Sequence, residues 1–238
     1  MIPGDPNVQS VELVAAALGD LRDELVLVGG CAASLLIDAP SAPPPRVTYD
    51  VDLVAEVAAL KEYYVLEREF SARGFVRDVS PDAPICRWCI GAVKVDLMPT
   101  SEAVLGFSNR WYVEAVRSAA PLRLPSGTVV RLISAPAFMA TKFEAFRTRG
   151  RADLISSHDF EDIINVVEGR PTLVEEIASA EVTLRAYLIG QFADVSAAPG
   201  FANTLPGLVA YDELHGQRVA AVMKRIETIA ARATNGVP

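Results

Sequence analysis

Short apolar runs separated by glycine, proline and polar residues make up the first half of the chain. Residues 24–28 end in four consecutive apolar residues before Gly29 and Gly30, which predicts a short buried strand. Similar reasoning predicts strands over 48–55, 75–79, 85–90, 93–98, 122–124 and 128–133, and helices over 11–21, 31–37, 57–72 and 110–118. Strands 85–90 and 93–98 are separated only by Gly91 and Ala92, which predicts a hairpin.

Helical periodicity dominates the second half. Apolar residues recur at helical spacing over 137–149, 157–168, 172–192 and 212–231. The predicted class is therefore α/β (α+β), a small mixed-sheet core with a helical C-terminal half. The boundary is expected near residue 133, giving a core over 1–133 and a helical domain over 134–238.

The composition indicates a soluble globular protein. The chain has 238 residues, of which 51% are hydrophobic and 22% charged, enough for one large domain or two small ones. No apolar run approaches the roughly 18 residues of a membrane span, and residues 1–10 lack a basic start and an apolar signal core. Three cysteines suit a reducing compartment. We therefore expect a cytoplasmic protein without a membrane partner.

Charge is distributed unevenly along the chain. The net charge of −8 excludes bulk attraction to nucleic acid. Residues 101–151, however, contain eight basic and three acidic residues, a net charge of +5. Lys142, Arg147, Arg149 and Arg151 cluster there, which is enough for a local anion site; the alternative is a solvated helix face.

Two carboxylates, Asp50 and Asp52, are the central candidates for chemistry. Side chains alternate along a strand, so both carboxylates project from one face while Val51 and Leu53 pack into the core. Two like charges this close repel each other unless a cation lies between them. Mg²⁺ or Mn²⁺ takes oxygen ligands and often substrate phosphates, so the pair suits phosphate chemistry. The alternative is an ordinary polar strand face.

A third acid, Asp96, strengthens this interpretation. It shares one face of the predicted strand 93–98 with Lys94 and Met98. An acidic residue in an otherwise apolar strand is costly to bury unpaired. If this strand lies beside the one that carries Asp50 and Asp52, three carboxylates converge, as in a two-metal site.

The glycine pair is the third candidate feature. Gly29 and Gly30 stand between the predicted strand 24–28 and the predicted helix 31–37. Glycines allow close approach of the backbone to a phosphate, and a helix N-terminus offers free N–H donors. A simple turn is the alternative. The order of strand, glycine pair, helix, Asp-x-Asp strand and later Asp strand makes the combination informative.

These motifs resemble the nucleotidyltransferase superfamily that includes DNA polymerase β, whose signature is a glycine pair, an Asp-x-Asp and a later third acid. The chain is more narrowly similar to AbiEii/AbiGii-type nucleotidyltransferase toxins, which have Gly-Gly-x-Ala, Arg-x-Thr/Ser-x-Asp-x-Asp, and later Lys, Arg and Asp-x-x-Asp on helices. The matching residues, spread over 24–168, are Gly29, Gly30, Ala32, Arg46, Thr48, Asp50, Asp52, Lys142, Arg149, Asp159 and Asp162. Cys31 stands where a hydroxyl or small residue is often found, so backbone donors are expected to contact the phosphate. That family has a small mixed sheet flanked by helices and a helical C-terminal extension.

The resemblance implies transfer of a nucleoside monophosphate from a nucleoside triphosphate to a hydroxyl. Asp50 and Asp52 would then hold two Mg²⁺ or Mn²⁺ ions, and Asp96 would share one of them and accept the acceptor's proton. Gly29 and Gly30 would cradle the triphosphate.

The helical half would supply the positive charge. Lys142 and Arg149 are seven residues apart and so share one helix face. They would neutralise the triphosphate and leaving pyrophosphate, whereas the alternative role is a surface salt bridge. The resemblance further implies a toxin, with transfer RNA (tRNA) ends as acceptor and an antitoxin protein as partner.

Two other functions remain open. A small-molecule nucleotidyltransferase of the antibiotic-modifying type would use the same metal site, and the net charge of −8 favours it. A non-catalytic interaction module of the same fold is disfavoured because all three acids are present.

The remaining motifs are interpreted as structural. Cys86 and Cys89 lie three apart in a predicted strand, hence on opposite faces, and no second pair accompanies them. His158 and His215 are too few for a histidine-rich metal site, and Ser156 or Ser157 is expected to cap a helix there. No Walker-type phosphate loop is present.

Overall fold

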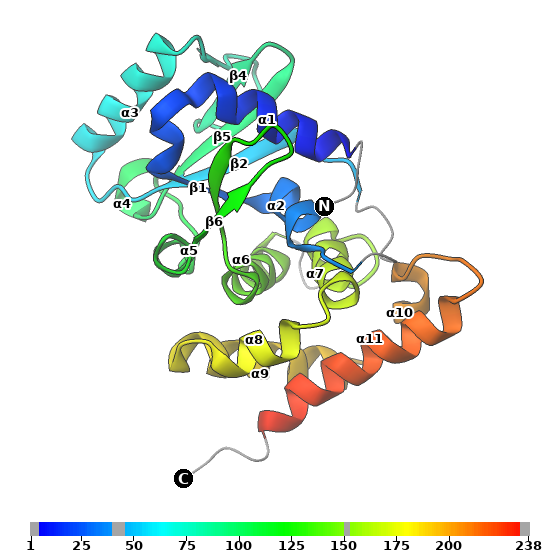
Figure 1. The fold of residues 1–238 in the computed structure, drawn as a ribbon. Helices are drawn as coiled ribbons and strands as arrows, with labels where there is room; N and C mark the ends of the chain where they lie inside the picture. The colour runs from blue at the N-terminus through cyan, green and yellow to red at the C-terminus, as the bar shows by residue number, and fades with distance from the viewer. Residues whose placement is uncertain (1–4, 40–45, 150–152, 234–238) are drawn as a thin grey trace. The chain divides into compact units, whose positions relative to one another are not determined.

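A mixed sheet organises the first part of the chain in the computed structural model, which describes residues 5–39, 46–149 and 153–233 (Figure 1). The described residues divide into two units. We call residues 5–35 and 46–138 the sheet unit, and residues 36–39, 139–149 and 153–233 the helical unit. This arrangement confirms the predicted α/β class. In the described part of the chain no helix combines the length and apolar character needed to cross a membrane.

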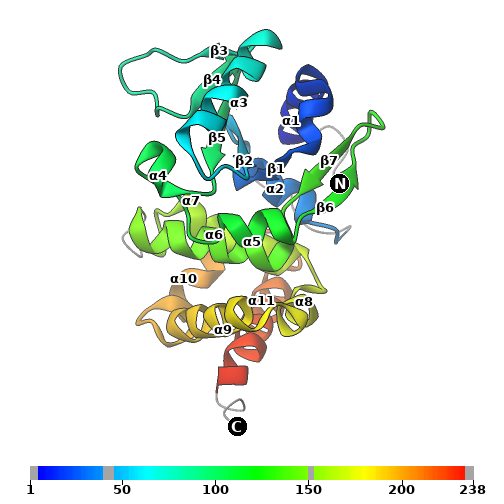
Figure 2. The ribbon, with the colours of Figure 1, turned by 90° about the vertical axis from the view of Figure 1, so that its left-hand side faces the viewer.

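The sheet has seven strands, in the order β3-β4-β5-β2-β1-β7-β6 (Figure 2). Their bounds are β1 (Leu25–Val28), β2 (Asp50–Ala55), β3 (Val76–Arg77), β4 (Arg87–Ile90), β5 (Val93–Pro99), β6 (Ala120–Arg123) and β7 (Val129–Leu132). The β2–β5 and β1–β7 pairs are parallel, and the other pairs are antiparallel. All the predicted strands are therefore present.

Five helices accompany the strands, and a sixth begins in the sheet unit. They are α1 (Pro6–Leu18), α2 (Gly29–Leu36), α3 (Leu60–Ala72), α4 (Glu102–Leu105), α5 (Tyr112–Arg117) and α6 (Ala135–Thr148), which continues into the helical unit. The predicted helix 11–21 is shifted in the structure because Asp5 caps the N-terminus of α1 and Pro6 begins it, while Gly19 ends it.

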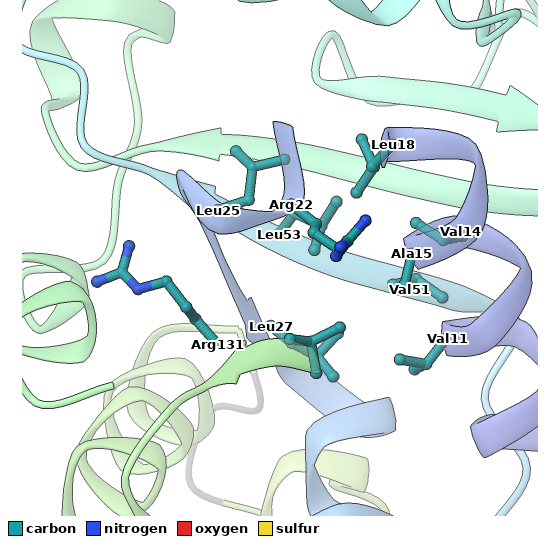
Figure 3. Close-up of a pocket in the computed structure, with 11 residues that line it drawn as sticks. Val11, Val14, Ala15, Leu18, Arg22, Leu25, Leu27, Val51, Leu53 and Arg131 are labelled. Carbon is teal, nitrogen blue, oxygen red and sulfur yellow. The ribbon is translucent and has the colours of Figure 1, made fainter. Parts of the chain in front are cut away.

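Helix α1 covers one face of the sheet. Val51 and Leu53 on β2 are buried and face apolar residues of α1 across a cavity of about 20 Å³ (Figure 3). The residues that line it are Val11, Val14, Ala15, Leu18, Arg22, Leu25, Leu27, Val51, Leu53, Val130 and Arg131. The lining is mainly apolar, and Val51 and Leu53 pack into the core as predicted. Asp50 and Asp52, which alternate with these two residues along β2, therefore belong to the opposite face.

The helical unit contains the rest of α6 and five more helices. These are α7 (His158–Gly169), α8 (Leu173–Ser179), α9 (Val182–Ala197), α10 (Phe201–Leu208) and α11 (His215–Ala230). Phe160 of α7 is fully buried and stacks on Phe146 with ring centroids 4.9 Å apart. Ser157 accepts a hydrogen bond from the Phe160 N–H, which confirms the predicted cap.

The prediction of one helix over 172–192 is wrong. Two helices, α8 and α9, replace it, because the Glu181 side chain accepts the N–H groups of Thr183 and Leu184 and starts a new helix. The predicted helix 212–231 is present as α11. Helices α4 and α10 were not predicted.

Candidate functional site

The three acids lie on neighbouring strands. In the parallel β2–β5 pair, Asp52 is opposite Asp96, and Asp50 is opposite Lys94. Because partners directly opposite each other point to the same side of a sheet, Asp50, Asp52 and Asp96 share one face. This confirms the strand adjacency on which the predicted convergence depended.

An arginine that the sequence analysis did not identify joins two of these acids. Arg87 lies opposite Asp96 in the antiparallel β4–β5 pair. Its Nε donates to Asp96 Oδ1 at 2.8 Å and its Nη2 to Asp96 Oδ2 at 2.7 Å; the same Nη2 also donates to Asp50 Oδ2 at 2.9 Å. Hydrogen bonds to Asp96 raise the pKa of Arg87 further above its usual range. Arg87 therefore compensates the charge of Asp96, which is only 7% exposed.

The glycine pair is packed against the carboxylate strand. Gly29 has φ +68°, and a Cβ built on it would lie 1.7 Å from Asp52 Oδ2 and 2.7 Å from Asp52 Cβ. A Cβ on Gly30 would lie 2.3 Å from Thr48 Cγ2. The two glycines form the first turn of α2 rather than a loop before it, so the predicted start at Cys31 is two residues late. Glycine is thus required at position 29 by the approach of Asp52.

Cys31 is turned toward the protein interior. Its Sγ lies 3.0 Å from Thr48 Oγ1 and donates to the Asp50 carbonyl oxygen at 3.3 Å. Burial raises the pKa of the Cys31 thiol to about 12, so the thiol stays protonated at neutral pH. Cys31 therefore ties α2 to the start of β2 as a neutral hydrogen-bonding group.

A buried asparagine holds the segment that leads into β2. Asn7 Nδ2 donates to Ser34 Oγ at 2.8 Å and to the Arg46 carbonyl oxygen at 3.0 Å. Asn7 Oδ1 accepts from the Thr48 N–H at 2.9 Å. These contacts connect α1, α2 and the approach to Asp50.

The helical unit contains a second charged cluster. Lys142 Nζ lies 3.0 Å from Asp159 Oδ1 and 2.7 Å from Asp162 Oδ2. Arg149 Nη2 donates to Asp159 Oδ2 at 3.3 Å. Lys142 and Asp162 are 7% and 1% exposed, so the surface salt bridge considered for Lys142 is a buried ion pair instead. Asp159 and Asp162, which matched the resemblance without an assigned role, are the partners of Lys142.

Two arginines that follow Lys142 in the sequence are exposed. The side chains of Arg147 and Arg149 are 56% and 76% exposed. Arg147 donates to Gln191 Oε1 at 3.3 Å. Arg151 lies outside the described residues.

The donor chemistry of the acidic face suits a divalent metal ion. Carboxylate oxygens are the ligands that Mg²⁺ and Mn²⁺ prefer, and Asp50, Asp52 and Asp96 supply them from adjacent strands. In the described ranges, no group of three or more His, Cys, Asp or Glu side chains is arranged to hold a metal ion. Instead, Asp50 and Asp96 meet at Arg87, and Asp52 packs against Gly29.

The cysteines and histidines form no comparable cluster. Cys86 and Cys89 are both free thiols, the first buried and the second half-buried. His158 lies 3.3 Å from Glu161 on the same helix, and His215 contacts the Ala210 carbonyl oxygen.

Comparisons with known proteins are sparse. No protein-family model and no curated protein matches the chain. The fold is similar to the solution structure of the antibiotic-resistance factor ANT(2'')-Ia, with 17% sequence identity and a TM-score of 0.47, over 80% of this chain and 95% of that chain. The similarity to AbiEii/AbiGii-type toxins thus stays a motif-level resemblance.

Proposed function

We propose that this protein is a metal-dependent nucleotidyltransferase that moves a nucleoside monophosphate from a nucleoside triphosphate to a hydroxyl group. The observation that carries the proposal is the placement of Asp50, Asp52 and Asp96 on one face of two adjacent parallel strands. The glycine pair supports it, because α2 begins at Gly29 directly beside Asp52.

The carboxylates have distinct proposed roles. Asp50 and Asp52 would hold Mg²⁺ or Mn²⁺, with Asp96 as a shared ligand; a bound divalent ion supplies positive charge to the phosphate oxygens. Asp96 would also accept the proton of the attacking hydroxyl. The acceptor oxygen forms a bond to the α-phosphorus, the bond between the α-phosphorus and its bridging oxygen breaks, and pyrophosphate leaves with that oxygen.

The triphosphate would be bound by backbone and cationic groups. The N–H groups at the start of α2, at Gly29 and Gly30, would donate to phosphate oxygens. The resemblance also assigns Lys142 and Arg149 to the charge of the triphosphate; in the helical unit both cations contact Asp159.

The proposed acceptor is the end of a tRNA. The proposed biological role is that of a toxin whose activity an antitoxin protein inhibits. The resemblance to AbiEii/AbiGii-type toxins suggests both, and the exposed Arg147 and Arg149 support an RNA contact because phosphate binding needs accessible cations. A small-molecule acceptor is the competing outcome of the test below.

The test is label transfer. The protein is incubated with Mg²⁺, each of four labelled nucleoside triphosphates and total tRNA, alongside Asp52→Asn and a control variant, Asp23→Asn, whose side chain is 72% exposed. We expect label in RNA with the wild type and the control, and none with Asp52→Asn. If none of the four nucleotides labels the RNA at low salt, the tRNA acceptor is rejected. If an aminoglycoside is labelled instead, the protein is a small-molecule nucleotidyltransferase.

A further inference from the structure

Arg87 occupies three of the six carboxylate oxygens of Asp50, Asp52 and Asp96, which the proposed function assigns to a metal ion. Its guanidinium contacts both oxygens of Asp96 and Oδ2 of Asp50, at 2.7 to 2.9 Å. The side chains of Arg87 and Asp96 are 16% and 10% exposed, so the pair is largely shielded from water. A bidentate arginine–carboxylate contact of this kind is among the stronger ion pairs in proteins.

The backbone fixes this contact. Ile90 pairs with Val93 across the two-residue connection Gly91–Ala92, and the same register places Arg87 opposite Asp96. Strand β5 lies between β4 and β2, so the Arg87 side chain extends over Asp96 to reach Asp50 on β2. Arg87 is thus held at the carboxylates by sheet pairing rather than by a loop.

A guanidinium and a divalent ion compete for the same carboxylate oxygens. Both are cations that require carboxylate lone pairs, and they repel each other at short range. Removal of Arg87 leaves Asp50 and Asp96 without their positive partner, which destabilises the metal-free protein and favours any other cation.

We propose that Arg87 is the counter-ion of the metal-free site, and that a divalent cation binds by displacing its guanidinium from Asp50 and Asp96. Arg87 therefore sets the metal affinity of the site. The inference rests on the proposed function only for the identity of the metal site; it concerns binding and does not depend on nucleotide transfer.

The test measures Mn²⁺ binding without nucleotide, by calorimetry and by the electron paramagnetic resonance signal of free Mn²⁺. Arg87→Gln removes the positive charge. Arg87→Lys keeps the positive charge but lacks the planar guanidinium group that binds a carboxylate through two hydrogen bonds. Arg77→Gln is the matched control, because Arg77 lies on the neighbouring strand β3 and pairs with Glu67 instead. We expect Arg87→Gln to bind Mn²⁺ about tenfold more tightly than the wild type, a change of the size typical for residues around a metal site. Arg87→Lys and Arg77→Gln should stay near the wild-type value.

Thermal denaturation gives an independent readout. Without metal, Arg87→Gln should melt below the wild type, and saturating Mn²⁺ should raise its melting temperature by more than it raises that of the wild type. Adding Asp50→Asn to Arg87→Gln should abolish the gain in Mn²⁺ affinity. If Arg87→Gln is too unstable to purify, Arg87→Met removes the same charge and keeps an unbranched apolar side chain at this position.

Three results would overturn the proposal in distinguishable ways. Equal or weaker Mn²⁺ binding by Arg87→Gln would show that Arg87 positions Asp96 and does not compete with metal, leaving the proposed function intact. Mn²⁺ binding that survives Asp50→Asn would place the metal elsewhere. No Mn²⁺ binding to any variant at millimolar concentration would overturn both this inference and a metal-dependent transferase.

Discussion

Gly29 and Asp52 restrict each other's identity, because the carboxylate side chain occupies the space of a Cβ at position 29. We expect Gly29→Ala to lower the free energy of unfolding by about 2–4 kcal/mol, from left-handed backbone strain plus the clash with Asp52. Gly19→Ala is the matched control, since Gly19 has a similar φ of +59° and nothing within 4 Å of its built Cβ. Urea denaturation of both variants separates the two contributions. Equal losses would mean that the contact with Asp52 has no energetic effect.

Lys142 is more important for stability than its place in a basic segment indicates. Lys142→Ala leaves Asp159 and the 1% exposed Asp162 without their shared cation, so we expect a loss of about 3–5 kcal/mol. Arg149→Ala removes a mostly exposed partner of Asp159 and should cost less than about 1 kcal/mol. Chemical denaturation measures both. A Lys142→Ala variant as stable as the wild type would contradict a stabilising role of the buried ion pair. Nucleotide binding would then be the remaining proposed role of Lys142.

At the residue scale, strand periodicity was sufficient to place the acids but not their partner. Asp50, Asp52 and Asp96 share a face because side chains alternate, which is readable from sequence. Arg87 could have been found by counting back from the two-residue Gly91–Ala92 connection, since that connection fixes which residue faces Asp96. The ion pairs of Lys142 join residues of α6 and α7. They could not be predicted from sequence, because contacts between two helices leave no local sequence pattern.

Among the elements, α1 both covers the sheet and restrains the segment before β2. Asn7→Ala removes the partners of the Thr48 N–H, the Arg46 carbonyl and Ser34, so we expect a loss of about 1–3 kcal/mol for the buried groups left unsatisfied. Ser10→Ala, which removes one exposed hydrogen bond from the same helix, should change stability little. The same denaturation experiment compares them, and equal stability of the two variants would contradict the proposed restraint.

Elements defined by apolar periodicity were predicted well, whereas two helix starts set by side-chain caps, those of α1 and α9, were not. The strands and the hairpin of β4 and β5 follow from short apolar runs and a two-residue turn. The break between α8 and α9 depends on the backbone N–H groups that donate hydrogen bonds to the Glu181 side chain. Apolar residues continue at helical spacing on both sides of this break. The start of α1 likewise depends on Asp5 rather than on the apolar pattern.

For the molecule as a whole, charge distribution bears on the acceptor. A net charge of −8 opposes RNA binding, whereas the net charge of +5 over residues 101–151 favours it locally. Transfer to RNA should therefore fall steeply as salt rises, because binding phosphates releases counterions. Replacement of Arg147 and Arg149 by Ala should weaken RNA labelling and flatten this salt dependence. Labelling that is independent of both salt and these arginines would exclude them as RNA contacts.

The two charged clusters of the proposed function belong to different units. The carboxylates are in the sheet unit, and Lys142 and Arg149 are in the helical unit. The proposal that the chain binds a metal ion and a nucleoside triphosphate depends on the carboxylates alone.

Calorimetric titration of Mg²⁺ and a nucleoside triphosphate into wild type and Asp52→Asn measures whether the carboxylates are required for this binding. Asparagine preserves the shape that packs against Gly29, so the variant removes charge with little change in volume. We expect metal-dependent nucleotide binding by the wild type and by the exposed control Asp23→Asn, and none by Asp52→Asn. Unchanged binding by Asp52→Asn, in a protein that melts like the wild type, would contradict the assignment of this acidic face as the site.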